Sequence, residues 1–405
     1  MRPLLPFLAL GFLPFLALAG ESPVLDSMDA PTFRPGSDQV QITQVDGANA
    51  NSGKALRFTF ADNARSAFAQ GKMRGTPAWD QAAGISFRVK GDGSTNCGGI
   101  QFVWNEDFAI RYDAAFPISG TEWTTVTIPW RDFIPVLANP ASVPLDPRGE
   151  RPPSKLGPLW FGKWWYWGNY AAHSYAIDDI RLEPTITQTE IAPPVGAPLA
   201  RVQAKLKAGK PITVVTMGDS LTDVRHWTNR QSNWPTFFAA QLKKEYGSEV
   251  TIVNPAIGGT ELKQNLVLIP RWLATTPRPD LVTVCFGHND WNSGMRGPAF
   301  RAALLDAVAR IRRLTGGSAD VLLITSMPSL PLWEPIGELA EACRQVAKET
   351  NSGLCDGFAL FTAVTPDGRA ALFVDDKVHL APAGQQALAT AVAAAVATNV
   401  PLPKL

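Results

Sequence analysis

Ser220 is the residue of this sequence whose type and position best suit covalent chemistry. It stands in the segment Gly-Asp-Ser-Leu at residues 218–221, directly after an apolar stretch, residues 212–217, that is typical of a buried strand. A serine at the carboxyl end of a parallel strand points toward a crevice, and Gly218 permits the tight turn there. An activated serine hydroxyl attacks carbonyl carbons, so the segment predicts acyl transfer. The alternative is a serine that only caps a helix.

A serine hydroxyl needs a base, and the sequence offers four histidines: His173, His226, His288 and His379. We expect His379 to be the base, because Asp376 lies three residues before it and one helix-like turn places both side chains on one side. Asp376 would hold one ring nitrogen while the other faces Ser220. Asp375 could also reach the ring and is the second choice for the acid.

Donors for a developing oxyanion follow two other apolar stretches. Asn289 comes just after residues 281–286, and the pair Gly258 and Gly259 comes just after residues 250–254. The Asn289 amide and a glycine N–H could each stabilise a transition state by about 3–4 kcal/mol. The alternative is that these residues only form turns.

The elements that must position these residues alternate regularly after residue 199. Predicted strands cover residues 212–217, 250–254, 281–286 and 321–325, with a weaker one near Leu354, and predicted helices cover residues 234–246, 298–314, 336–349 and 382–396. Strands that alternate with helices predict a parallel sheet covered on both faces. Ligands collect at the carboxyl ends of such strands, where all the candidate residues fall.

In this order, the four segments resemble the SGNH (GDSL-type) hydrolase superfamily. The blocks are Gly-Asp-Ser-Leu-Thr at 218–222, Asn-Pro-Ala-Ile-Gly-Gly-Thr at 254–260, Gly-His-Asn-Asp at 287–290 and Asp-Lys-Val-His at 376–379. The resemblance spans about residues 211–398 and implies a flavodoxin-like three-layer fold. It implies Ser220 as nucleophile, His379 as base and Asp376 as acid, and an oxyanion hole from Ser220, Gly259 and Asn289. No cofactor and no metal is expected.

Two other histidines compete for the role of the base. His226 lies six residues after Ser220 on a predicted loop, and His288 adjoins Asn289. Neither has an acid in the position that the superfamily uses. The form Gly-His-Asn-Asp is similar to that of rhamnogalacturonan acetylesterase-like members, so we expect His288 to contact substrate. The pentapeptide Gly-x-Ser-x-Gly of ordinary α/β-hydrolases is absent.

The amino-terminal part, residues 20–183, has a different pattern. Short alternating stretches at residues 55–60, 84–89, 99–104 and 124–129 are separated by turn residues and predict an all-β sandwich. Together with the closing segment 175–182 they resemble galactose-binding-like jelly-roll carbohydrate-binding modules. Residues 184–198, with four prolines, are predicted to form a linker before the catalytic domain, residues 199–405.

Aromatic residues suggest how a sugar could be held. Eight of the 13 tryptophans lie between Trp79 and Trp167, and residues 160–167 are especially rich in them. Aromatic faces stack on sugar rings, so Trp164 and Trp165 are candidate substrate contacts, as are Trp227 and Trp291 beside the predicted crevice. The alternative is that these rings fill the sandwich or pack on the catalytic domain.

The composition bounds the remaining questions. Residues 1–19 have the short basic start, apolar run and small-residue cleavage site of a signal peptide, so export and no membrane anchor are expected. The 37 basic and 36 acidic residues argue against a nucleic-acid partner. Cys343 and Cys355 are the candidate disulfide pair, with four buried thiols as the alternative, since no zinc spacing occurs.

These observations predict an exported serine esterase that removes acetyl groups from a polysaccharide or oligosaccharide. The first alternative is a lipase or thioesterase of the same superfamily that acts on non-sugar esters. The second is a non-catalytic polysaccharide-binding protein, which the intact set of Ser220, Gly259, Asn289 and His379 argues against.

Overall fold

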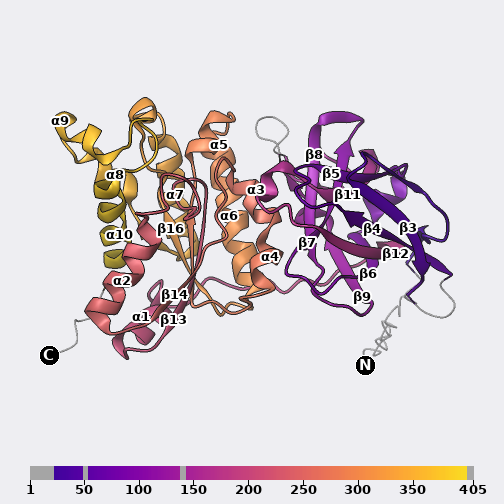
Figure 1. Cartoon of the computed structure of the whole chain (residues 1–405), viewed down its shortest axis with the longest axis horizontal. Coiled ribbons are helices and arrows are strands. Elements are labelled where there is room, and N and C mark those ends of the chain that lie inside the picture. The colour runs from indigo at the N-terminus through magenta and orange to yellow at the C-terminus, as the bar shows by residue number, and fades with distance from the viewer. Residues whose placement is uncertain (1–21, 49–52, 137–142, 399–405) are drawn as a thin grey trace, which may run out of the picture.

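The computed structural model describes residues 22–48, 53–136 and 143–398. The predicted signal peptide, residues 1–19, lies outside the described residues. Figure 1 shows two bodies side by side along the long axis, a β-sandwich and an α/β domain. This arrangement confirms the expected fold class, and each body is built from the elements described below.

The amino-terminal body consists of two six-stranded antiparallel sheets within the described residues. One has the order β3-β4-β12-β6-β9, with β1 also pairing with β12, and the other has the order β10-β8-β7-β11-β5-β2. The strands are β1 (Val24–Asp26), β2 (Phe33–Pro35), β3 (Val40–Asp46), β4 (Lys54–Phe60), β5 (Ala67–Gly71), β6 (Gly84–Lys90), β7 (Cys97–Trp104), β8 (Asp107–Pro117), β9 (Thr124–Pro129), β10 (Ile134–Pro135), β11 (Leu156–Lys163) and β12 (His173–Glu183).

The aromatic residues of the sandwich lie mostly between the two sheets. Phe58 and Phe161 stack with ring centroids 5.3 Å apart, and Trp79 stacks on Trp130 at 5.6 Å. Both tryptophans are fully buried, and the Trp130 indole N–H donates to the Ala82 carbonyl oxygen at 2.9 Å. Much of the tryptophan richness of this body therefore reflects core packing, because large rings bury the most apolar area.

The carboxy-terminal body is a five-stranded parallel sheet of order β14-β13-β15-β16-β17. Its strands are β13 (Ile212–Gly218), β14 (Val250–Val253), β15 (Leu281–Cys285), β16 (Asp320–Ile324) and β17 (Gly353–Cys355). The principal helices are α1 (Ala200–Lys207), α2 (Trp234–Tyr246), α3 (Leu262–Val267), α4 (Ile269–Leu273), α5 (His288–Asn292), α6 (Gly297–Leu314), α7 (Gly337–Thr350), α8 (Gly357–Thr362), α9 (Pro366–Arg369) and α10 (Pro382–Val396).

Alternate residues of these strands enter two separate cores. Val282 and Val284 of β15 pack with residues of α3, α6 and α7, whereas Leu281 and Cys285 pack with residues of α2 and α10. A strand directs successive side chains to opposite faces, so both faces of the sheet are covered by helices. The three-layer architecture confirms the predicted flavodoxin-like arrangement.

Local chemistry explains why the predicted helices form where they do. Helices α2 and α10 have the predicted bounds, α6 begins one residue earlier than predicted, and α7 is shifted by one residue at both ends. Asn233 caps α2 by accepting the Thr236 N–H at 2.9 Å, and Gly247 ends the helix with a φ of 70°. Such caps satisfy backbone groups that a helix end otherwise leaves unpaired.

The predicted disulfide between Cys343 and Cys355 is wrong. All four cysteines are buried free thiols. Cys343 lies in the core on the α7 side of the sheet, while Cys355 points from β17 into the core on the α10 side. The sheet therefore separates the two sulfur atoms, and the alternative of small buried side chains holds.

The two bodies share one apolar core. Trp164 and Trp167 of the sandwich pack in the same cluster as Ile257 and Leu262 of the α/β body. The Arg271 guanidinium also donates to the Trp167 carbonyl oxygen at 2.6 Å. Helices α3 and α4 contact β8, and Figure 1 shows them on the side of the α/β body that faces the sandwich. Continuous burial of this kind fixes the position of one body against the other.

Charged groups at the edge of this interface add a second set of contacts. Asp132 of the sandwich accepts from Arg313 at 2.9 Å and pairs with the nearly buried Arg310 at 3.2 Å. Arg310 also donates to the Arg131 carbonyl oxygen at 2.7 Å. Charge-assisted hydrogen bonds with little solvent access are stronger than exposed ones, so they reinforce the apolar contact.

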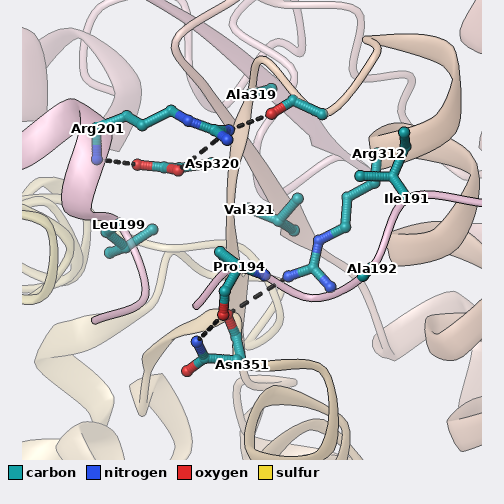
Figure 2. A pocket seen from close by; sticks show the side chains of 11 residues that line it. Ile191, Ala192, Pro194, Leu199, Arg201, Arg312, Ala319, Asp320, Val321 and Asn351 are labelled. Atoms are coloured by element: carbon teal, nitrogen blue, oxygen red, sulfur yellow. Dashed lines mark hydrogen bonds and ion pairs between the residues drawn. The ribbon is translucent and has the colours of Figure 1, made fainter. Parts of the chain in front are cut away.

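The segment between the bodies has no helix or strand from residue 184 to 199. Gln188 and Glu190 bond to Arg131 of the sandwich, and the later part of the segment lies along the α/β body. The Asn351 side chain donates to the carbonyl oxygens of Pro194 and Gly196 at 2.7 and 2.9 Å. Figure 2 shows the small cavity beside this segment, about 30 Å³ in volume, between Arg201, Asp320 and Arg312. Asp320 begins β16, so this cavity lies at the amino ends of the strands, opposite Ser220.

Candidate active site

Ser220 lies in a turn that leaves the carboxyl end of β13, and two asparagine side chains hold this turn. A Cβ atom at Gly218 would lie 2.4 Å from Thr222, so only glycine fits this turn. The Asn229 side chain donates to the Ser220 carbonyl oxygen at 2.6 Å, and Asn254 donates to that of Thr222 at 2.9 Å. These bonds fix the backbone of the turn and with it the direction of the hydroxyl group.

His379 and Asp376 approach Ser220 from the loop before α10. The Ser220 Oγ lies 2.8 Å from the His379 Nε2, and the His379 Nδ1 lies 2.7 Å from the Asp376 Oδ2. The second Asp376 oxygen accepts the backbone N–H groups of Val378 and His379, both at 2.9 Å. The structure thus brings together the three predicted residues in the geometry of a hydroxyl, imidazole and carboxylate triad.

The two candidate acids have different surroundings. Burial raises the pKa of Asp376, but the backbone N–H groups of His379 and Val378 and the His379 ring outweigh it and lower the pKa below its usual value. Asp376 is therefore ionised while it holds the imidazole. Both acids are exposed, but Asp375 makes no such contact within the described residues, which fits its ranking as second choice.

Backbone N–H groups free for an oxyanion occur at the two expected places. The Gly258 N–H donates to Asp223 at 3.2 Å, whereas the N–H groups of Gly259 and Ser220 have no acceptor in the described part of the chain. Gly259 has a φ of 77°, a conformation that favours glycine. The contacts therefore favour Gly259 over Gly258 as the backbone donor of the second block.

Asn289 is the third predicted donor, at the start of α5. Its side-chain nitrogen lies 3.0 Å from the Thr260 carbonyl oxygen and 3.5 Å from Asp219. The first contact ties Asn289 to the segment that carries Gly259, while the second is long and weak. The Asn289 amide therefore lies beside the backbone donors. One of its two N–H groups is held only by the long contact to Asp219.

Two buried carboxyl groups lie beneath these donors. Burial raises the pKa of Asp219 to about 7, although the Leu221 N–H opposes this. Burial also raises the pKa of Asp290 to about 8, against the Leu262 N–H that Asp290 accepts at 3.0 Å. Removal from solvent favours the protonated form of a carboxyl group, and at Asp290 burial outweighs the nearby Lys263.

The structure separates the two histidines that competed for the role of base. His226 stacks on His379 with ring centroids 4.4 Å apart, and its Nδ1 lies 2.8 Å from the Thr228 Oγ1. His288 is half-buried and its Nδ1 has no partner in the described residues. Only His379 reaches the Ser220 hydroxyl.

The four candidate tryptophans differ in how much of each ring is exposed to solvent. Trp164 is only 3% exposed and packs between the two bodies, so its prediction as a sugar contact is wrong. Arg296 covers one face of the half-buried Trp291, 3.8 Å from the ring centroid. Trp227 and Trp165 remain exposed, at 65% and 50%, and only these two present a free ring at the surface.

Sequence reasoning missed the polar residues that support the triad from behind. Asn229 is fully buried, and besides Ser220 it bonds to Asp223 and accepts from Gln385 of α10 at 2.9 Å. It thereby joins the nucleophile turn to the helix that follows His379. The sequence showed Asn229 only as a polar residue in a segment without helix or strand periodicity, and that signal is too weak to identify a supporting role.

A serine, histidine and aspartate triad beside unpaired N–H groups, at the carboxyl edge of a parallel α/β sheet, defines a serine ester hydrolase. Residues 216–387 match the GDSL-like Lipase/Acylhydrolase family. Residues 43–145 match the family Complex I intermediate-associated protein 30 (CIA30). The carboxy-terminal domain is a GDSL-like acylhydrolase domain, and the protein is an ester hydrolase with a separate amino-terminal β-domain.

Individual proteins are similar to part of this chain. The isoamyl acetate-hydrolyzing esterase 1 homologs of Mus musculus and Rattus norvegicus are 25% and 26% identical over 201 residues, covering 43% of this chain and 77% of each relative. An acetylxylan esterase from Geobacillus stearothermophilus is 20% identical, with a TM-score of 0.39, over 48% of this chain and 97% of its own. The lipase/acylhydrolase from Enterococcus faecalis is 18% identical, also with a TM-score of 0.39, over 48% of this chain and all of its own.

Two further features concern the setting of the enzyme. Across the described ranges, no group of three or more histidine, cysteine, aspartate or glutamate side chains is arranged to hold a metal ion. None of the helices in those ranges has the length and apolarity needed to cross a membrane.

Proposed function

We propose that this protein is an exported serine carbohydrate esterase that removes acetyl groups from an acetylated polysaccharide or oligosaccharide. The ester hydrolase class follows from the site and the family. The sugar, the acetyl group and the export are the proposed parts, and each has its own support.

The proposed reaction uses the residues at the carboxyl edge of the sheet. The Ser220 Oγ attacks the ester carbonyl carbon while the His379 Nε2, 2.8 Å away, takes its proton. Asp376 stabilises the imidazolium that forms. The negative charge on the carbonyl oxygen is held by the N–H groups of Ser220 and Gly259 and by the Asn289 amide. His379 then protonates the leaving alcohol, and a water molecule activated by His379 hydrolyses the acyl-enzyme.

The observation that carries the sugar half of the proposal is the pair of exposed tryptophans beside the triad. The Trp227 ring centroid lies 6.4 Å from that of His379, and its ring is 65% exposed. Trp165 belongs to the β-domain but borders the same region, in a groove that also includes His226 and Gly258. Exposed rings next to a reactive centre suit the apolar faces of sugars, which otherwise offer only hydroxyl groups.

The acetyl half is supported by the relatives. The mouse and rat proteins are named as homologs of an isoamyl acetate-hydrolyzing esterase, so their names refer to an acetyl ester. Isoamyl alcohol is not a sugar, and the same names therefore favour a second candidate, an esterase that acts on acetate esters of non-sugar alcohols.

Acetate release from a panel of acetylated xylan, mannan, pectin and alginate tests the proposal, with 4-nitrophenyl acetate, isoamyl acetate and 4-nitrophenyl palmitate for comparison. We expect the highest kcat/KM on a polysaccharide or its oligosaccharides. Higher values on isoamyl acetate than on every glycan would support the second candidate. Preference for the palmitate would place the enzyme among lipases instead.

The proposal of export rests on the sequence of residues 1–19, with its basic start, apolar run and small residues before the expected cleavage point. Expression of the full chain in a secreting host should yield a processed protein outside the cytoplasm, with an amino terminus near residue 20. An unprocessed protein that stays in the cytoplasm would refute this part.

A further inference from the structure

A groove of about 430 Å³ runs between the β-domain and the catalytic domain and reaches Gly258, beside the nucleophile. Its walls include Trp165 and Tyr170 from one domain and Arg225, His226 and Gly258 from the other. The volume lies within the range of about 300–1,000 Å³ that is typical of ligand sites. Because both domains contribute, this groove exists only in their packed arrangement.

The groove lies next to the catalytic centre, with Gly258 between the two. A Cβ atom placed on Gly258 would lie 3.2 Å from the His226 ring and 3.5 Å from the Ser220 Cβ. The glycine backbone therefore forms a thin wall that touches both the groove and the nucleophile. An ester at Ser220 could direct either its alcohol portion or its acyl portion toward His226 and the β-domain. An acetyl group is too small to fill the groove, so the alcohol portion of an acetate ester is the part that fits it.

The hydrogen bonds around His226 determine which ring nitrogen can accept a bond from a ligand. The Asn229 amide nitrogen donates to two carbonyl oxygens, so its Oδ1 is an acceptor, and Thr228 donates to it at 3.0 Å. The Thr228 oxygen must then accept from the His226 Nδ1–H at 2.8 Å. The Nε2 of neutral His226 is left as an acceptor without a partner in the described residues, suited to a sugar hydroxyl.

The wall from the β-domain is held rigidly. The Tyr170 hydroxyl donates to the Trp165 carbonyl oxygen, and the buried Lys163 ammonium donates to the Tyr170 carbonyl oxygen at 2.9 Å. The neighbouring Trp164 and Trp167 are anchored in the interdomain core. A preorganised aromatic side chain loses little entropy on binding, which favours a role in recognition.

The groove also offers cationic donors. The Arg65 guanidinium lies over the Tyr170 ring, 5.7 Å from its centroid, and has no carboxylate partner in the described part of the chain. Arg225 is bound to Asp223 and to the Ala256 carbonyl oxygen, so it is fixed in place. Guanidinium groups donate to hydroxyl and carboxylate oxygens, both of which sugar chains carry.

We propose that this interdomain groove binds the sugar unit next to the acylated one, with the Trp165 ring stacked on the sugar and the His226 Nε2 accepting one of its hydroxyl groups. The β-domain then acts as part of the substrate-binding site rather than as an independent carbohydrate-binding module. This inference rests on the proposed function, because it needs a glycan ester as substrate.

Steady-state kinetics of Trp165→Ala on acetylated xylo-, manno- and pectic oligosaccharides, compared with 4-nitrophenyl acetate, test the inference. We expect KM for the best oligosaccharide to rise about tenfold, with a much smaller effect on the aryl ester, since only the longer substrate reaches the ring. Trp165→Phe keeps an aromatic face and should restore most of the loss.

Phe108→Ala is the matched control, because Phe108 is another exposed ring of the β-domain, 48% exposed, and is absent from the groove. It should behave as the wild type on all substrates. Thermal unfolding of each variant shows whether the fold is intact. Equal KM values for Trp165→Ala and Phe108→Ala, in an enzyme that deacetylates oligosaccharides, would overturn the groove assignment alone. A wild type that releases no acetate from any oligosaccharide would overturn the proposed function and the groove together.

Discussion

His226 lies face to face with His379, with ring centroids 4.4 Å apart and planes inclined by 22°. Burial lowers the pKa of His226, and the charge of a protonated His379 lowers it further. His226 therefore stays neutral when His379 becomes an imidazolium during the reaction. A charged neighbour at this distance would oppose that step, because two cations in a partly buried site repel strongly.

His226→Lys tests this requirement against His226→Gln, a neutral substitution of similar length. We expect kcat/KM on 4-nitrophenyl acetate to be at least about tenfold lower for the lysine variant than for the glutamine variant. The acid limb of the lysine variant should also move to lower pH, because the added cation disfavours protonated His379. Identical pH profiles for the two variants would contradict the argument.

Ser220→Ala should reduce hydrolysis of 4-nitrophenyl acetate by about 10⁴-fold or more, because no other hydroxyl of the described residues bonds to the His379 ring. The melting temperature should stay close to that of the wild type, since a hydroxyl and not a core group is removed. Ser318→Ala is a suitable control, because the Ser318 hydroxyl donates to the Thr315 carbonyl oxygen near the opposite edge of the sheet. Substantial turnover by the Ser220 variant would refute the assignment of the nucleophile.

Asp376→Asn and Asp375→Asn form a matched pair of neighbouring substitutions. Asp376 holds the His379 Nδ1 at 2.7 Å, so its amide variant should lose about 10²- to 10⁴-fold in kcat. Asp375 is exposed and its variant should lose less than about threefold. A larger loss for Asp375→Asn than for Asp376→Asn, measured under the same conditions, would reverse the choice of acid.

Asn289→Ala removes the side-chain donor that lies beside the Gly259 segment. We expect kcat to fall by about 10²- to 10³-fold with little change in KM, because the donor acts mainly on the charge of the transition state. Asn292→Ala, an exposed asparagine at the end of the same helix, serves as the control. If KM rose while kcat held, Asn289 would be a binding residue instead.

Asp290 should make the stability of the fold depend on pH. Its pKa is raised to about 8 by burial, whereas an unfolded aspartate titrates near about 3.9. The folded state keeps the proton over this interval, so the unfolded state binds fewer protons and stability falls as pH rises from about 4 to 8.

Asp290→Asn removes that dependence while keeping the acceptor for the Leu262 N–H. We expect the free energy of unfolding of the variant, relative to the wild type, to increase by about 2–4 kcal/mol between pH 5 and pH 8. Urea unfolding at the two pH values measures it, and Asp375→Asn should show no such change. A constant difference between variant and wild type would mean that Asp290 is ionised in the fold.

Much of the catalytic domain could be predicted from the sequence because the signals are local. The bounds of α2 and α10 follow from helical periodicity, proline and caps, and strands β13, β14, β15 and β16 follow from short apolar runs. In a parallel sheet such strands end at one edge, so Ser220, Gly259 and Asn289 had to lie near one another. The spacing of Asp376 and His379 likewise placed acid and base together.

The sequence by itself therefore determined the class of each domain and the residues proposed to carry the reaction. Only the tertiary structure decided that Trp164 is buried while the adjacent Trp165 is exposed, that His226 stacks on His379, and that Cys343 and Cys355 lie on opposite faces of a sheet. Residue type sets how much apolar area a side chain can bury. Which side chains are buried, and which line a groove, depends on the surface that another segment or domain covers.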